Sequence, residues 1–171
     1  AHLDGKGAGL MEMAGLAQKG GAVALHCRLS NAPADISAIR VALGEADALI
    51  GGDLVVSADN KILSLTMAGR DRLTLFDASK LAEKLLGDTI FSNMMIMGAA
   101  WQRGLIPLTR EAILKAVEMN GTAVDRNQRA FDLGRWAVLH PDRAGELLAD
   151  TVTRLPDTPE TRIVARVDHL T

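Results

Sequence analysis

The sequence predicts an α/β protein, namely a three-layer α/β/α domain with a mainly parallel sheet, followed by a helical C-terminal part. Two observations lead to this prediction. Short apolar segments bounded by turn residues alternate with segments of helical periodicity in the first half of the chain. Such alternation is typical of parallel sheets covered by helices. The later half has almost only helical patterns, which explains the expected helical C-terminal part.

Four segments have the character of strands. The first two are expected on either side of a glycine-containing loop, and the second ends at the turn signal Ser30-Asn31-Ala32-Pro33. The third is an apolar run that stops at Gly51-Gly52. Residues 36–42 are expected to form a connector or a short helix. The four expected strands cover residues 8–13, 22–29, 46–50 and 73–76.

Helix boundaries are indicated by capping residues. Asp77 or Ser79 is expected to be the N-cap of a helix that ends at Gly87. Thr109 is expected to be the N-cap of a second helix, which ends at Asn120-Gly121. The segment capped by Asp88 is apolar nearly all round, so we expect a buried helix whose methionines pack in the core. The expected helices cover residues 54–63 after Asp53, 79–86, 89–102, 110–120, 124–138 and 143–151.

Composition excludes several classes of protein. The 171 residues are 48% hydrophobic and 23% charged, as in an ordinary globular domain, and the net charge of −2 argues against a nucleic-acid surface. One cysteine rules out an internal disulfide and an iron–sulfur cluster held by this chain alone. It also indicates a reducing compartment, so a cytoplasmic location is expected. No apolar run reaches the ~20 residues of a membrane span.

The loop at Gln18, Lys19, Gly20 and Gly21 is the first candidate binding site. It puts a flexible cation and an amide donor beside glycines, whose backbone N–H groups can approach an anionic ligand. The spacing matches neither of the common phosphate-binding loops. An ordinary tight turn explains the same residues.

His26 and Arg28 form the second candidate. Residues two apart on a strand point to the same face, so the pair could meet a carboxylate or phosphate in a cleft. Alternatively, Arg28 pairs with a surface acid and His26 is a neutral residue with its own partner. Cys27 would then face the other side as a small buried hydrophobic residue.

No catalytic residue and no metal ligand is predicted. The acidic residues show no paired spacing that is typical of a metal or acid/base site, and capping and solvation explain them. No nucleophile–histidine set is recognisable in the sequence.

Several blocks of sequence resemble one family. The most specific is Gly15-Leu16-Ala17-Gln18-Lys19-Gly20-Gly21, followed by His26 and Arg28. Together they are similar to the gamma-type domain of a 2-oxoacid:ferredoxin oxidoreductase, most closely the indolepyruvate type, over about residues 5–136. The other blocks that carry the likeness lie at residues 46–56, 85–108 and 118–135.

The resemblance implies a role inside a larger enzyme. The complete enzyme would oxidatively decarboxylate an aryl 2-oxoacid with thiamine diphosphate, iron–sulfur clusters and coenzyme A, and pass electrons to ferredoxin. This chain would hold no cofactor alone and would be inactive without its partner domains or subunits. Gln18, Lys19, Gly20, Gly21, His26 and Arg28 would lie towards coenzyme A. No nucleic acid or membrane partner is expected, and the apolar helix allows a homodimer.

The resemblance also sets expected boundaries. Residues 1–138 would form the gamma-type domain, lacking its first strand and glycine-rich turn, and 139–171 a helical extension or the start of a following region. The stretch at 67–73 is shorter than in indolepyruvate-type members, so a loop there is deleted or the subgroup differs. Two other functions stay open: an independent nucleotide- or acyl-CoA-binding module, and a purely structural assembly domain.

Overall fold

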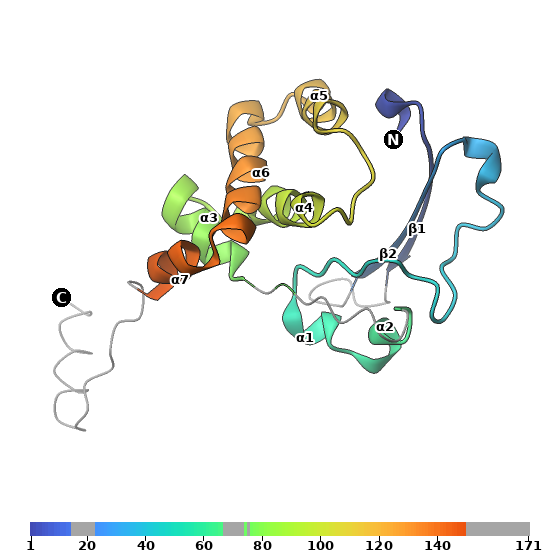
Figure 1. Cartoon of the computed structure of the whole chain (residues 1–171), viewed down its shortest axis with the longest axis horizontal. Helices are drawn as coiled ribbons and strands as arrows, with labels where there is room; N and C mark the ends of the chain where they lie inside the picture. The colour runs from blue at the N-terminus through green and yellow to red at the C-terminus, as the bar shows by residue number, and fades with distance from the viewer. Residues whose placement is uncertain (15–22, 67–73, 75, 150–171) are drawn as a thin grey trace, which may run out of the picture.

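The chain forms a mixed α/β structure in which a two-stranded sheet stands beside a group of helices (Figure 1). The computed structural model describes residues 1–14, 23–66, 74 and 76–149. Helices α3 to α7 gather on one side, and the strands stand on the other.

The sheet consists of β1 (Gly7–Ala14) and β2 (Val23–Ser30), close to the first two expected strands. The strands are antiparallel, with Gly7 opposite Ser30 and Ala14 opposite Val23. Only the eight residues 15–22 join them, and a parallel pair needs a crossover of a dozen or more residues. The mainly parallel three-layer sheet is therefore not confirmed in the described part of the chain.

The third expected strand, residues 46–50, is wrong. The fourth, residues 73–76, is only partly described. Residues 46–50 contribute a single isolated parallel bridge, between Ala46 and Thr66. In the last expected strand, Thr74 and Phe76 have no strand conformation, and residues 73 and 75 lie outside the described residues. An apolar run becomes a strand only where a neighbouring strand accepts its backbone hydrogen bonds.

One face of the hairpin is covered by the connection that follows it. A short turn, η2 (Pro33–Asp35), begins this connection. Glycines at positions 7 and 9 let it lie close to β1, because a Cβ at Gly7 would overlap with Pro33 and one at Gly9 would press against Ile36. The residues 36–42 form an irregular connector rather than a helix.

In the helical half, the helices begin and end close to the predicted capping residues. The Asp77 carboxylate accepts the Lys80 N–H at 2.9 Å, and Gly87 ends the helix in the left-handed conformation. Thr109 and Gly121 bound the predicted helix 110–120 in the same way. The helices are α3 (Ala78–Leu86), η3 (Thr89–Phe91), α4 (Ser92–Gln102), α5 (Arg110–Asn120), α6 (Val124–Leu139) and α7 (Pro141–Ala149).

Three expected helices differ in extent or continuity, and one of them, 89–102, consists of the 3-10 turn η3 followed by α4. The one after Asp53 splits into two single-turn helices, α1 (Leu54–Ser57) and α2 (Asn60–Leu63), each with an aspartate N-cap. The last one begins at Pro141 rather than at Arg143, since proline suits the first turn of a helix. Residues 150 and 151, its expected end, lie outside the described residues.

The core belongs to the helices. Leu81, Met95 and Phe131 are the largest fully buried side chains, so the predicted core role of the methionine-rich helix is confirmed for Met95. The connected core cluster is built from α3, η3, α4, α6 and α7. No hairpin residue whose side chain the structure describes is part of it.

Candidate functional site

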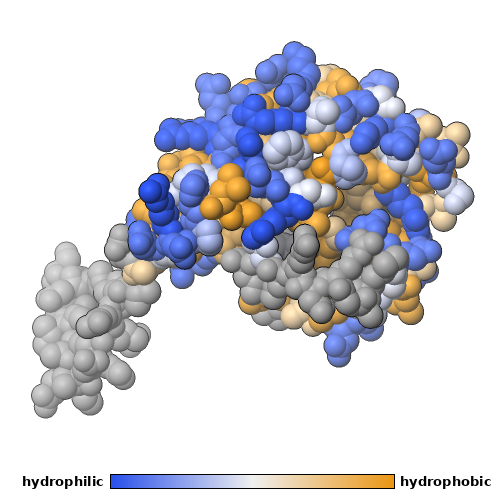
Figure 2. Space-filling view, in the orientation of Figure 1, coloured by the Kyte–Doolittle hydropathy of each residue, from blue (hydrophilic) through white to orange (hydrophobic). Residues whose placement is uncertain are grey.

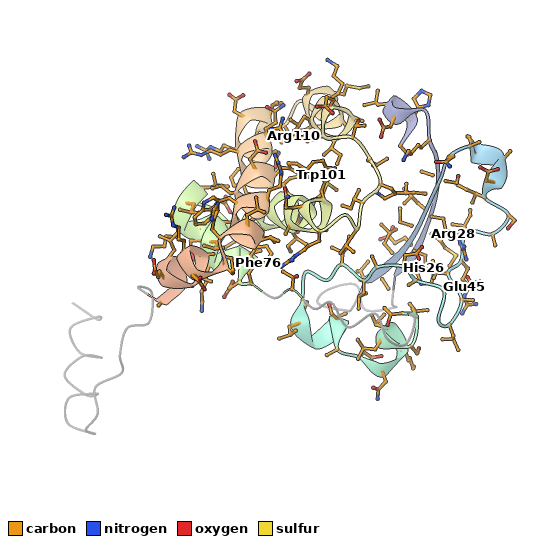
Figure 3. The ribbon with its side chains drawn as sticks, viewed as in Figure 1. His26, Arg28, Glu45, Phe76, Trp101 and Arg110 are labelled. Atoms are coloured by element: carbon orange, nitrogen blue, oxygen red, sulfur yellow. The ribbon has the colours of Figure 1, made fainter. Side chains whose placement is uncertain are left out.

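Strand β2 places His26 and Arg28 on one face, as their spacing predicts. This face is the one covered by residues 33–45, and Figure 3 shows both side chains with Glu45 in that region. His26 is only 6% exposed. The pair therefore lies beneath the connection rather than at an open surface.

The histidine has a partner inside the chain. Its Nδ1 accepts the Val41 backbone N–H at 2.9 Å. An imidazole nitrogen that accepts a hydrogen bond carries no proton, so the arrangement requires the neutral tautomer with the proton on Nε2. His26 thus holds the connection against the sheet as a neutral acceptor.

The arginine also has partners inside the chain. One Arg28 terminal nitrogen (Nη2) lies 2.5 Å from Glu45 Oε2 and 2.9 Å from the Arg40 carbonyl oxygen. The same carboxylate accepts the Ala42 N–H, and these two hydrogen bonds, led by the one from Ala42, lower the pKa of Glu45. Arg28 Nε is buried without a hydrogen-bond partner among the described residues.

These bonds agree with the alternative in which Arg28 pairs with an acid and His26 is neutral. A role of either residue in cofactor binding stays a prediction. The predicted contact loop of Gln18, Lys19, Gly20 and Gly21 lies outside the described residues.

The expectation that Cys27 is buried is wrong. Cys27 lies on the other face of β2 and is exposed, because nothing in the described structure covers that face. Its partial desolvation raises the pKa of the thiol. A raised pKa leaves less thiolate at neutral pH, so Cys27 has no sign of an activated nucleophile.

A large open cavity lies where the sequence predicted no site. It measures about 1070 Å³ and is bounded by the segment 49–63 on one side and by α3 and α4 on the other. This volume is slightly above the roughly 300–1,000 Å³ of most small-ligand pockets. Its apolar walls are formed by Leu49, Ile50, Leu54, Leu63, Phe76, Ile96 and Leu105.

Few polar groups enter the cavity. Asp77 lies there, but its carboxylate caps α3 and is 3.5 Å from the Lys80 ammonium. Arg103, just past the end of α4, is exposed and has no side-chain partner among the described residues. No sequence signal indicated a site at Arg103, since a cation at the C-terminal end of a helix normally complements the helix dipole.

The described residues do not fit a metal or iron–sulfur centre. They contain no group of three or more His, Cys, Asp or Glu side chains placed to hold a metal ion. The whole chain has one cysteine, whereas such clusters are held by several thiolates. No helix in the described ranges is long and apolar enough to cross a membrane.

Comparison with known proteins decides the family. The family model described as pyruvate ferredoxin/flavodoxin oxidoreductase matches residues 1–137. The chain belongs to this family. No curated protein and no solved structure matches the sequence.

Family membership confirms the resemblance at its coarser level. The chain is a domain of the pyruvate ferredoxin/flavodoxin oxidoreductase family and thus part of an oxidoreductase. The match spans both the hairpin and the helices through most of α6. The hairpin, the covering connection and helices α3 to α5 therefore lie within the matched residues, and α7 (Pro141–Ala149) lies outside them.

Proposed function

We propose that this chain is the gamma-type domain of a thiamine-diphosphate-dependent 2-oxoacid:ferredoxin oxidoreductase of the indolepyruvate type. The observation that carries the proposal is the family match over residues 1–137. The block from Gly15 to Arg28 supports the indolepyruvate type through its resemblance to that subgroup. In the complete enzyme, thiamine diphosphate would serve the decarboxylation, iron–sulfur clusters the electron transfer to ferredoxin, and coenzyme A the acyl transfer.

This chain would support that chemistry without holding the reacting groups. Its single cysteine and the absence of a metal-binding group among the described residues favour clusters in other domains or subunits. We assign to Lys19 and Gln18 contacts with the phosphates or amide groups of coenzyme A. The hydrogen bond that His26 accepts from Val41 and those that Arg28 donates to Arg40 and Glu45 would stabilise the strand that follows the loop.

The complete oxidoreductase tests the loop assignment through Lys19→Ala. A charge-assisted hydrogen bond contributes about 1.5–3 kcal/mol, so its loss should raise the KM for coenzyme A roughly tenfold or more. The KM for the 2-oxoacid should stay unchanged. Lys61→Ala is the matched control, because Lys61 is an exposed lysine of α2.

Two results would count against these assignments separately. An unchanged coenzyme A KM and turnover in the Lys19→Ala enzyme would remove the loop from the coenzyme A site. Ferredoxin reduction with pyruvate but not with indolepyruvate would leave the family intact and reject the aryl substrate.

A further inference from the structure

The connection that covers β2, residues 33–45, is held by few contacts. None of its residues is fully buried. Figure 2 shows hydrophilic and hydrophobic surface intermixed where Figure 1 places this connection. Residues 37–41 make no backbone–backbone hydrogen bond to another described residue. A segment with few buried contacts and few backbone hydrogen bonds opens locally at a low cost in free energy.

Both ends of the connection are anchored. At its start, Pro33 lies so close to β1 that a Cβ at Gly7 would overlap with it. Near its end, the Gly44 N–H donates to the Ser64 carbonyl oxygen at 2.9 Å. Gly44 has a φ of 73°, which a glycine adopts without strain. The part between these anchors, residues 36–43, can therefore open while its two ends stay in place.

Two side chains of β2 hold the middle and the end of the connection. His26 Nδ1 accepts the Val41 N–H at 2.9 Å. Arg28 donates to the Arg40 carbonyl oxygen at 2.9 Å and to the Glu45 carboxylate (Figure 3). A guanidinium keeps its protons at any pH that a protein meets, whereas an imidazole gains one near neutral pH. Of these bonds, the one to His26 is therefore the one that a modest fall in pH can remove.

A proton on His26 Nδ1 is incompatible with the hydrogen bond from Val41. The proton would turn the accepting nitrogen into a donor, so that two donors would face each other. His26 is 6% exposed while the connection is closed, and opening would bring its nitrogen into water. Because the closed form excludes a proton that the open form accepts, a falling pH favours the open form.

The surrounding charges do not secure a protonated histidine in the closed form. On β1, Met11 and Gly9 lie opposite His26 and Arg28, so this strand brings no charge to the covered face. A proton on His26 would add a second cation next to Arg28, which like-charge repulsion opposes. The two acids of the connection already accept hydrogen bonds from other groups. Among the described residues, the charged side chains of the packed segments are Arg28 on β2 and Asp35, Arg40 and Glu45 on the connection.

We propose that His26 is a proton-operated latch. In its neutral form it closes the connection over β2, and in its protonated form it releases residues 36–43 and exposes the face of β2 that carries His26 and Arg28. The latch belongs to the fold of this chain and does not rest on the proposed function.

Amide hydrogen exchange of the full chain, followed by NMR, tests the latch at Val41. The exchange rate is divided by the intrinsic rate at each pH, which gives a protection factor. An ordinary histidine is roughly 90% protonated at about pH 5.5, so the Val41 protection factor should fall roughly tenfold between about pH 7.5 and about pH 5.5. Phe131, buried in α6, should keep its protection factor. A constant value at Val41, or an equal fall at Phe131, would overturn the proposal.

His26→Asn assigns the response to the imidazole. The asparagine side-chain oxygen can accept the Val41 N–H in place of Nδ1 and does not titrate. In this variant the Val41 protection factor should not change over the same pH interval. Cys27→Ser, on the opposite face of β2, is the matched control and should keep the wild-type fall. A fall of wild-type size in His26→Asn would overturn the proposal, and the wild-type pH series decides it if this variant fails to fold.

Glu45 is the other titratable group that holds the connection. Hydrogen bonds, first from the Ala42 N–H and then from Arg28, hold the pKa of its carboxyl below the usual range. Glu45 therefore stays ionised over the tested interval. Glu45→Gln should lower the Val41 protection factor at both ends of the interval and keep its pH dependence. Loss of the pH dependence in Glu45→Gln would assign the response to the carboxylate and overturn the proposal.

Discussion

Gly98 of α4 and Gly134 of α6 lie at the crossing of their two helices, each against the backbone of the other helix. A Cβ at Gly98 would overlap with the Phe131 carbonyl oxygen, and a Cβ at Gly134 would overlap with that of Met95. The two contacts are reciprocal, because each glycine lies three residues after the residue that the other touches. The helices can approach this closely only where both side chains are absent.

Gly98→Ala and Gly134→Ala should therefore each destabilise the chain. The added methyl group forces the helices apart and costs about 1–3 kcal/mol, which urea unfolding would measure. Gly145→Ala in α7 is the control, because its Cβ would meet nothing within 4 Å. It should be neutral or stabilise by about 0.5–1 kcal/mol through higher helix propensity. Equal losses at all three positions would refute the close crossing.

The contact between Asp4 and Thr109 should make stability depend on pH. The Asp4 carboxylate accepts the Thr109 hydroxyl and backbone N–H at 2.7 Å each, and these bonds, led by the hydroxyl, lower the pKa of Asp4. A lowered pKa stabilises the fold above the ordinary aspartate pKa of about 3.9, and the effect is lost as the pH falls through the folded-state value. Asp4→Ala should lower the Tm at pH 7.

The difference in Tm between Asp4→Ala and the wild type should shrink below about pH 3.9. Glu146→Ala is a suitable control, because Glu146 is an exposed acid of α7 without a partner among the described residues. A Tm difference for Asp4→Ala that stays constant down to pH 2 would exclude the carboxylate as its cause.

Asp132 should couple α5 to α6 in a salt-dependent manner. Its carboxylate pairs with Arg110 at 2.8 Å and with Arg135 at 2.9 Å, and the Arg135 guanidinium lies 4.9 Å from the centre of the Trp101 ring. Asp132 is partly exposed, so Asp132→Asn should cost up to about 1 kcal/mol in dilute buffer.

This cost should fall in 1 M NaCl, where the Debye length is about 3 Å. Thermal unfolding at low and high salt checks it. Glu118→Gln removes a pair with Lys115 within α5 alone, so its effect should be smaller. An effect of Asp132→Asn that is independent of salt would point to lost hydrogen bonds rather than to charge.

His26→Leu should release the connection over β2. Without an acceptor for its N–H, Val41 should exchange its amide hydrogen faster, and the unmade bond should cost roughly 1 kcal/mol. Amide hydrogen exchange measures this directly. Cys27→Ser on the opposite face should leave Val41 exchange unchanged, and a Val41 rate unaffected by His26→Leu would rule out this role.

The helices were largely predictable because their signals are local. Asp77 and Gly87, like Thr109 and Gly121, lie within one turn of the ends they define, so neighbouring residues alone determine them. The sheet was not predictable in the same way. Whether residues 46–50 form a strand depends on partners distant in the sequence, and the described residues offer only one bridge.

In the candidate site, too, features set by neighbouring residues were predictable, and features set by residues distant in the sequence were not. The shared face of His26 and Arg28 followed from strand periodicity, which needs two residues only. Glu45 as the partner of Arg28 lies 17 residues away, and many acids were equally eligible. The cavity could not be predicted, because it forms where segments far apart in the chain fail to touch.

The bonds that join the hairpin to the helices also have a consequence for the order of folding. Lys6–Pro107 and Asp4–Thr109 connect residues 101 and 105 positions apart. During synthesis at ~5–20 residues per second, the first strand would wait several seconds before its anchoring residues leave the ribosome. The helices, whose backbone hydrogen bonds join residues four apart, can form during the same interval. The nascent hairpin is thus the part of this domain for which an early-binding partner or chaperone would matter most.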